Sequence, residues 1–339
     1  MVHLLSFADH WKELLRGDRS AASALDAARR TEAPRPADGQ TVRRWEFLAG
    51  ATAVDAAVGR LVEGHLDAVA ILREAGREPG PQRYGVWASR AMGQRVVAGP
   101  TSTGWRLSGS LPFSSGAGTV ERALVVADAD RDDAASSRLL IDLPTDQPGV
   151  HLVPGTWPSV AMAATDSFTV ELRDVPIEAD DVVGPPGFYT EREGFWYGSL
   201  GVAACWAGAA AAVAQRAVDC ADGSGDPHVA AHLGALHASV AGMEAVLEAT
   251  AAELDCGGLA DRVRAEVAAL TVRHLVERES EAIVHHAGRA GGATLLAHDP
   301  EHAGRIHDLL LYIRQSHGER DLARLGTLIG TDRGRLPGR

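Results

Sequence analysis

The sequence predicts an α+β fold in which a helical region comes first, a β-rich region follows, and a bundle of long helices comes last. Apolar residues recur at helical spacing through residues 1–82, short β-rich runs separated by turn residues fill 83–187, and helical spacing returns over 188–330. The length of 339 residues accommodates three such domains. We expect the remaining residues, 331–339, to form a disordered tail.

The N-terminal region contains two helical patterns separated by a polar break. In the first pattern, apolar residues recur at helical spacing at Leu4, Phe7, Trp11, Leu14 and Leu15. A polar, Pro-rich stretch at 31–40 interrupts it, and a second helical pattern then runs through 42–77. Pro79, Gly80 and Pro81 end this second pattern, so the helical region stops close to residue 82.

The middle region is predicted to be built from strands alone. Its β-rich runs lie at 85–87, 95–97, 105–107, 123–127, 139–143 and 168–177. Turn residues separate these runs, and no helical pattern stands between them. We therefore expect an antiparallel barrel or sandwich rather than a sheet built from βαβ units.

The C-terminal region is predicted to form an up-and-down bundle of four helices. The expected helices cover about 199–221, 227–254, 259–287 and 301–326. Each exceeds about 20 residues and is therefore about 30 Å or more in length. Short turns containing Gly and Asp join them, which favours antiparallel neighbours.

Charge and composition exclude several classes of protein. The formal net charge is −12 at pH 7, which argues against nucleic acid or an anionic membrane as the main partner. Lys12 is the only lysine, so a P-loop lysine or a Schiff-base lysine elsewhere is excluded. A small molecule is the expected ligand.

Cysteine and histidine usage give no indication of a metal site. The three cysteines, Cys205, Cys220 and Cys256, are widely spaced and predict a reducing, cytoplasmic compartment. The adjacent His285 and His286 point about 100° apart on a helix and cannot easily share one ion. We expect no metal, no signal peptide and no membrane span.

Two motifs in the β-rich region resemble those of the acyl-CoA dehydrogenase family. Residues 104–117, GWRLSGSLPFSSGA, resemble the family pattern GWxLxGxKxFITNA, and residues 162–184 resemble the segment that closes its middle β-domain. Residues 58–72 resemble the last N-domain helix of the flavin-dependent monooxygenase branch, and 287–325 resemble the family's Gly-Gly turn and final helix. The resemblance covers about residues 42 to 328 and implies the fold described above, with a shortened N-terminal domain.

The resemblance implies a flavoenzyme with FAD, or alternatively FMN, held between the β-domain and the bundle. Phe113 then stacks on the flavin ring and the Ser115 hydroxyl bonds flavin N5, roles that suit an aromatic face and a hydroxyl. Trp87 and Ser89 fall where the family contacts the pyrimidine edge. Phe113 and Trp87 are alternatively plain core aromatics of the β-domain.

A second part of the implied cofactor site lies at the Gly-Gly turn. Arg289, Gly291 and Gly292 match it, and their backbone N–H groups and positive charge suit a phosphate. The same residues are alternatively an ordinary turn between helices.

The catalytic glutamate of the family is missing. Ser316 falls at its expected place, so His317, one residue further on, is the best candidate base, and Glu319 is the next. His317 is alternatively a solvated helix residue.

Three functions remain open at this point. The first is a dehydrogenase that oxidises a CH–CH bond of an acyl thioester with another base, and the second is a monooxygenase of the same fold. The third is a non-catalytic partner subunit, which the acidic, arginine-free connection 222–228 motivates. The resemblance also implies a homodimer or homotetramer.

Overall fold

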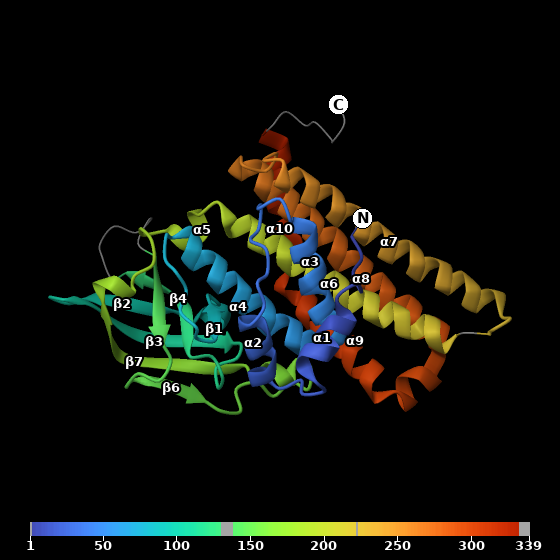
Figure 1. Ribbon diagram of the computed structural model, residues 1–339, viewed down its shortest axis with the longest axis horizontal. Helices are drawn as coiled ribbons and strands as arrows, with labels where there is room; N and C mark the ends of the chain where they lie inside the picture. Colours follow the sequence, from blue (N-terminus) through green and yellow to red (C-terminus); the bar gives the residue numbers. More distant parts are fainter. Residues whose placement is uncertain (1, 130–137, 222, 332–339) are drawn as a thin grey trace. The chain divides into compact units, whose positions relative to one another are not determined.

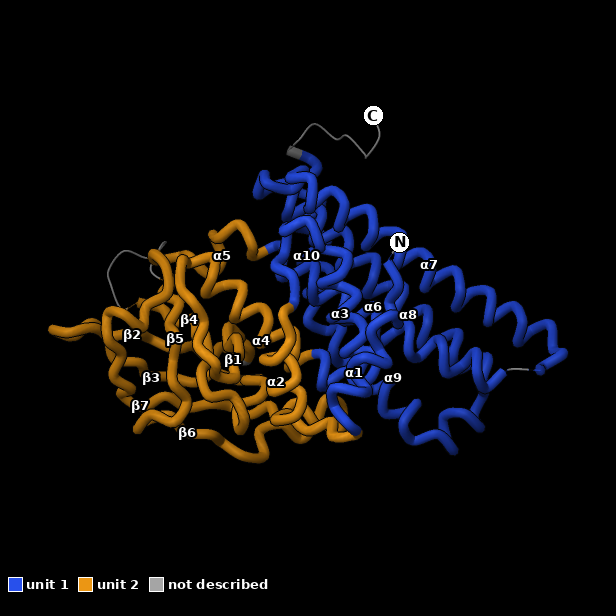
Figure 2. The backbone as a smooth tube through the Cα atoms, in the orientation of Figure 1, with its two compact units in different colours: residues 1–16, 33–59, 196–339 blue, residues 17–32, 60–195 orange. Residues whose placement is uncertain are grey.

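The computed structural model describes residues 2–129, 138–221 and 223–331. The expected tail at 331–339 lies outside these ranges apart from the main chain of residue 331. The chain divides into two units (Figure 2). Unit 1 comprises Met1–Arg16, Ala33–Gly59 and Trp196–Arg339, and unit 2 comprises Gly17–Glu32 and Arg60–Phe195. The region 1–82, expected to be one helical domain, is thus shared between the units.

Unit 2 contains a seven-stranded sheet (Figure 1). Its strands are β1 (Tyr84–Trp87), β2 (Val96–Pro100), β3 (Gly104–Ser114), β4 (Arg122–Ala129), β5 (Arg138–Pro144), β6 (Val150–Val153) and β7 (Phe168–Glu178). The order is β1-β4-β2-β3-β7-β6, and β5 pairs with β4. Each β-rich run expected from the sequence overlaps one of these strands. Strand β6 was not expected.

The sheet is mixed rather than purely antiparallel. The pairs β2–β3, β3–β7, β4–β5 and β6–β7 are antiparallel, as expected, but β4 runs parallel to β1 and to β2. Parallel neighbours need a long connection between them. The β2–β3 hairpin lies between β1 and β4 in the sequence and provides that length, which is why no crossover helix is needed.

Helices α2 (Ala21–Arg29) and α5 (Phe188–Glu191), together with α4 (Ala56–Glu74) from Arg60 onward, accompany the sheet in unit 2. The α4 residues Ala68, Ile71 and Leu72 form a core cluster with strand residues that include Leu124 and Leu140. Burying each large apolar side chain stabilises the fold by about 1.5–3 kcal/mol. This packing holds α4 against the sheet.

Unit 1 is helical. It contains α1 (Ala8–Leu15), α3 (Thr41–Val54), α6 (Gly194–Cys220), α7 (Pro227–Asp255), α8 (Arg262–His298), α9 (Pro300–Tyr312) and α10 (Glu319–Thr331). The first three expected bundle helices are confirmed, although α8 continues past residue 287 through a kink at Gly292, where φ is 60° and ψ is −166°.

The fourth expected bundle helix is wrong. Instead of one helix over 301–326, α9 is followed by the 3-10 turn η4 (Ile313–Gln315) and then by α10. Ser316 is extended, with a ψ of 140°, and Gly318 is left-handed, with a φ of 53°. A helix cannot continue through these two backbone conformations.

Helix α6 is long and apolar enough to span a membrane by length and composition, but 78% of its most apolar window is buried. It packs very closely against α3. A Cβ atom on Gly208 would lie 2.2 Å from the backbone oxygen of Ala49, so only glycine permits this approach. Burial of this kind is what a core helix requires.

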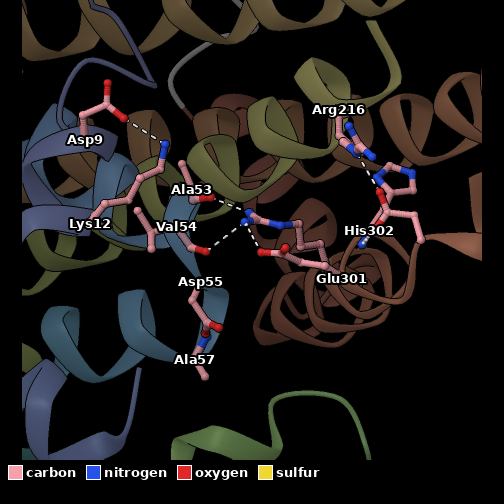
Figure 3. A network of polar contacts seen from close by, with 11 residues as sticks. Asp9, Lys12, Ala53, Val54, Asp55, Ala57, Arg216, Glu301 and His302 are labelled. Atoms are coloured by element: carbon pink, nitrogen blue, oxygen red, sulfur yellow. Dashed lines mark hydrogen bonds and ion pairs between the residues drawn. The ribbon is translucent and has the colours of Figure 1, made fainter. Parts of the chain in front are cut away.

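The start of α9 is tied to two other helices of unit 1 (Figure 3). The Arg305 guanidinium donates to the backbone oxygens of Ala53 and Val54, which are end carbonyls of α3 that lack a helical partner. Arg216 on α6 donates to Asp299, the residue that caps α9, at 2.6 Å. His302 lies beside them, is 1% exposed, and has no hydrogen-bond partner at either ring nitrogen.

Candidate functional site

Phe113 occupies a strained and exposed position near the end of β3. Its φ is 61°, in the left-handed region, and its side chain is 48% exposed. A β-bulge produces this conformation, because β3 places one extra residue between the pairs Leu111–Val170 and Ser114–Phe168. A left-handed residue other than glycine costs about 1–2 kcal/mol. Strain at an exposed aromatic side chain is typical of functional positions.

Trp157 packs against this ring. The two ring centroids are 5.6 Å apart and the rings are nearly perpendicular, at 87°. The Trp157 indole N–H donates to the backbone oxygen of Ala161 at 3.0 Å, which fixes the orientation of the indole. Trp157 therefore packs against the Phe113 ring in a fixed orientation. Sequence reasoning missed Trp157, although a tryptophan in a Pro/Gly-rich loop was a usable signal.

Ser115 begins a short chain of hydroxyl groups. The Ser167 oxygen lies 3.4 Å from Ser115 Oγ, and the Thr165 oxygen lies 2.8 Å from that of Ser167. The backbone N–H of Gly116 also donates to the Thr165 oxygen of the main chain at 2.8 Å. These contacts hold the turn after β3 against the segment before β7, and so bring the two sequence motifs together.

Trp87 and Ser89 have structural partners of their own. Trp87 is 2% exposed, and its indole N–H donates to the backbone oxygen of Ser115 at 3.0 Å. Trp87 thus positions Ser115 from the core. Ser89 is half-buried and accepts the N–H of Ala91 at 3.3 Å, which starts a 3-10 turn. Their expected contacts with a flavin stay predictions.

A shallow cavity lies beside Ser115 within unit 2. Its lining is mostly apolar and consists of Leu25, Arg60, Leu61, Gly64, Tyr84, Gly85, Val86, Ser115 and Val120. The Arg60 guanidinium is bound to Glu63 at 2.6 Å. Gly116 has a φ of 71°, and a Cβ there would lie 3.1 Å from Leu61. Glycine is therefore required where the β3 turn approaches α4.

In unit 1, the predicted catalytic residues lie at the break between α9 and α10. The side chain of His317 is 57% exposed, and its ring Nδ1 atom lies 3.2 Å from the Asp321 carboxylate. The backbone N–H of His317 donates to the same carboxylate at 3.1 Å. Ser316 accepts the N–H of Gly318 at 3.3 Å, and Glu319 is exposed in the first turn of α10. Sequence reasoning missed Asp321, although its i, i+4 spacing from His317 was visible.

Arg273 on α8 fixes the turn that precedes His317. Its buried guanidinium donates to the backbone oxygens of Gln315 and Ser199, at 2.9 and 3.2 Å. It also lies over the Trp206 ring, 4.4 Å from the centroid. The Arg273 side chain thus connects α8 to α6 and to the η4 turn, which precedes His317.

The Gly-Gly segment lies at a kink at Gly292, where two helical stretches of α8 meet. Arg289 is exposed, Gly291 and Gly292 are half-buried, and only Gly292 leaves the helical conformation. These residues lie in unit 1, as do Ser316, His317 and Glu319, whereas Trp87, Ser89, Phe113 and Ser115 lie in unit 2.

No family model and no curated protein matches this sequence. Solved structures do match over almost the whole chain. Dibenzothiophene monooxygenase TdsC from Paenibacillus sp. A11-2, bound to FMN and indole, has 20% identity and a TM-score of 0.80, covering 99% of this chain and 98% of its own. Butyryl-CoA dehydrogenase from Megasphaera elsdenii has 15% identity and a TM-score of 0.77, covering 96% and 97%.

A third structure is similar to the same extent. KijD3 in complex with FMN and a dTDP-linked amino sugar has 16% identity and a TM-score of 0.78, covering 99% of this chain and 94% of its own. The chain therefore has the acyl-CoA dehydrogenase fold. The motifs at 104–117 and 162–184 predicted this fold, and the β3–β7 pairing places them side by side.

Proposed function

We propose that this protein is a flavin-dependent oxidoreductase that uses FAD or FMN. The observation that carries the proposal is Phe113, an exposed aromatic ring held at a φ of 61° by a β-bulge, two residues before a hydroxyl group. The fold adds support, because TdsC and KijD3 were solved with FMN and PigA, another structure of this fold, with FAD.

The residues around Phe113 offer a stacking surface and hydrogen-bonding groups that suit a flavin. An exposed ring offers a face for stacking on a planar heterocycle. Each hydroxyl has one proton, so the chain from Thr165 through Ser167 to Ser115 can reverse its donor direction. Ser115 can then donate or accept, which suits a ring nitrogen that changes from acceptor to donor on reduction. A bound flavin would supply hydride or electron transfer.

For the reaction, we propose oxidation of a CH–CH bond of an acyl thioester. This needs a base that removes the proton next to the carbonyl group. His317 is the candidate, and Asp321 at 3.2 Å orients its imidazole. Arg273 donates to the backbone oxygen of Gln315 and so fixes the main chain just before His317.

Monooxygenation is the second candidate, and one observation favours it. No carboxylate stands between Asp308 and Glu319, so the family's glutamate has no counterpart in the final helices. Activation of O2 by reduced flavin does not require that base. TdsC, which shares the fold, is a dibenzothiophene monooxygenase.

The absorption spectrum of the purified protein is the first test. We expect the bands of oxidised flavin, or their appearance when FMN or FAD is added. Anaerobic bleaching by acyl-CoA thioesters would support dehydrogenation, and flavin-reductase-dependent O2 use with an aromatic heterocycle would support monooxygenation. A folded protein that takes up neither flavin would contradict the proposal and favour a non-catalytic partner subunit.

We also propose a homodimer or homotetramer in the cytoplasm, acting on a small molecule. Sedimentation at micromolar concentration tests the assembly, and a monomer would contradict it. The cysteines support a reducing compartment, because Cys205, Cys220 and Cys256 form no disulfide bond with one another.

A further inference from the structure

Two histidines from different helices of unit 1 face each other. His232 on α7 and His286 on α8 are 54 residues apart in sequence, yet their Nδ1 atoms are 2.9 Å apart. Along α8 itself, the adjacent His285 and His286 point in different directions. The tertiary structure instead provides a partner from the neighbouring helix.

We propose that His232 and His286 together bind one late first-row divalent cation, Cu2+, Ni2+ or Zn2+, which cross-links α7 to α8. The separation of the two nitrogens matches the spacing such an ion requires. Metal–imidazole bonds of about 2.0–2.1 Å at angles of about 90–109° place two nitrogens about 2.8–3.4 Å apart. The ion lies to one side of the line between the two nitrogens, so each ring turns by about 35–45° from the direction of the hydrogen bond to aim its lone pair at the ion. The shared proton moves to Nε2 of its own ring.

The ligand type selects the metal. Imidazole nitrogen suits Cu2+, Ni2+ and Zn2+, whereas Mg2+ and Ca2+ prefer oxygen ligands. Affinity for one site generally rises from Ni2+ to Cu2+ and falls again at Zn2+. We therefore expect Cu2+ to bind most tightly.

The surroundings allow binding but limit its strength. Both histidines are half-buried, so the donor ring can move its proton to Nε2, and water can complete the coordination. Among the described residues, no group of three or more His, Cys, Asp or Glu side chains could hold a metal ion, so the protein supplies two ligands here. Arg289 lies three residues beyond His286 and opposes a cation, but it is exposed and screened by solvent.

Metal titration of the untagged full chain tests the proposal. Isothermal titration with Ni2+, Cu2+ and Zn2+ is expected to show one site. H232Q and H286Q should each weaken that site at least tenfold. H237Q is the matched control, because His237 is an exposed histidine on the same α7 helix, and it should change affinity less than twofold.

A stability measurement distinguishes the cross-link from binding at scattered histidines. Saturating Ni2+ should raise the Tm of the wild-type chain and of H237Q, but not that of H232Q or H286Q, with circular dichroism verifying that all are folded. Nitrogen hyperfine lines from two imidazoles should appear in the electron paramagnetic resonance spectrum with Cu2+. Unchanged affinity in the folded H232Q/H286Q double variant would overturn the proposal.

Discussion

The ring of Phe113 packs nearly perpendicular to the ring of Trp157, at 87° and 5.6 Å between centroids, while the Phe113 backbone is held in the left-handed region. A fold that required only a filled position here would accept glycine or asparagine at lower cost. The proposed stacking of the aromatic ring on a flavin accounts for phenylalanine at this strained position.

Phe113→Asn should separate stability from flavin binding. Asparagine tolerates a positive φ, so relief of about 1–2 kcal/mol of strain offsets the lost ring contact. We expect the free energy of unfolding to stay within about 1 kcal/mol of wild type, whereas large aromatic truncations in a core cost about 3–5 kcal/mol. Urea unfolding measures the first quantity. Fluorescence titration should show flavin affinity reduced at least tenfold, and unchanged affinity would contradict the assigned role.

His317→Ala should slow turnover without affecting flavin binding, if His317 is the base. General acid–base catalysis contributes about 10²–10⁴-fold, so we expect a loss of about 100-fold or more in kcat. Stopped-flow reduction with the accepted substrate measures the step directly. His307→Ala is the matched control, because His307 is an exposed histidine on α9. Equal rates in the two variants would remove His317 from the mechanism.

Arg273→Lys should destabilise unit 1 and displace the turn before His317. Lysine cannot reproduce the guanidinium fork that reaches Ser199 and Gln315 or its stacking on Trp206. We expect a loss of about 2 kcal/mol in the free energy of unfolding, measured by urea denaturation. Arg278→Lys, at a 58% exposed position of the same helix, should change it by less than about 0.5 kcal/mol. A similar small change in Arg273→Lys would contradict the proposed positioning role.

His65 should make the fold sensitive to acid. Burial, with a smaller contribution from the Arg29 charge, lowers its pKa from 6.5 to about 4. Its Nδ1 accepts the N–H of Tyr84 at 3.1 Å, a bond that protonation of this nitrogen would break. The unfolded chain takes up the proton first, so stability is complete above pH 6.5 and declines as pH falls toward 4.

The size of this decline follows from the shift in pKa. The free energy of unfolding is expected to fall by about 3 kcal/mol in total as the pH falls from above 6.5 to below 4. His65→Gln keeps an acceptor but cannot titrate, so urea unfolding between pH 7 and pH 4.5 should show a flatter pH dependence. If the free energy of unfolding falls equally with pH in wild type and in the variant, groups other than His65 determine the stability in acid.

His302→Leu should stabilise the protein. Both ring nitrogens of His302 are buried without a partner, and an apolar side chain of similar size removes that desolvation cost. Burial lowers the pKa of His302, with Arg216 and Arg305 acting in the same direction and Asp299 against it. We expect the free energy of unfolding to rise by about 1 kcal/mol at pH 7. The gain should be larger at pH 5, because the lowered pKa of His302 lets the unfolded wild-type chain take up a proton first. A lower Tm than wild type would indicate a polar partner for His302.

Local patterns in the sequence were sufficient for the order of the elements. Helical and strand periodicity depend on neighbouring residues, so the strands β1 to β5 and β7 and the first three bundle helices were predictable. The motif at 104–117 also predicted the fold, because its spacing is a local property. The break at Ser316 and Gly318 was missed, although residues 314–321 contain no apolar residue. The extended backbone at Ser316 and the left-handed backbone at Gly318 interrupt the helix there.

By itself, the sequence determined the order of most helices and strands, the fold class and the choice of Phe113, Ser115 and His317 as candidates. Only the tertiary structure decided which residues accompany them: Trp157 beside Phe113, Ser167 beside Ser115, and Arg273 at the turn before His317. The contact between His232 and His286 also appears only in the tertiary structure. The physical reason is that these contacts join residues that are distant along the chain, through packing and hydrogen bonds that no local spacing specifies.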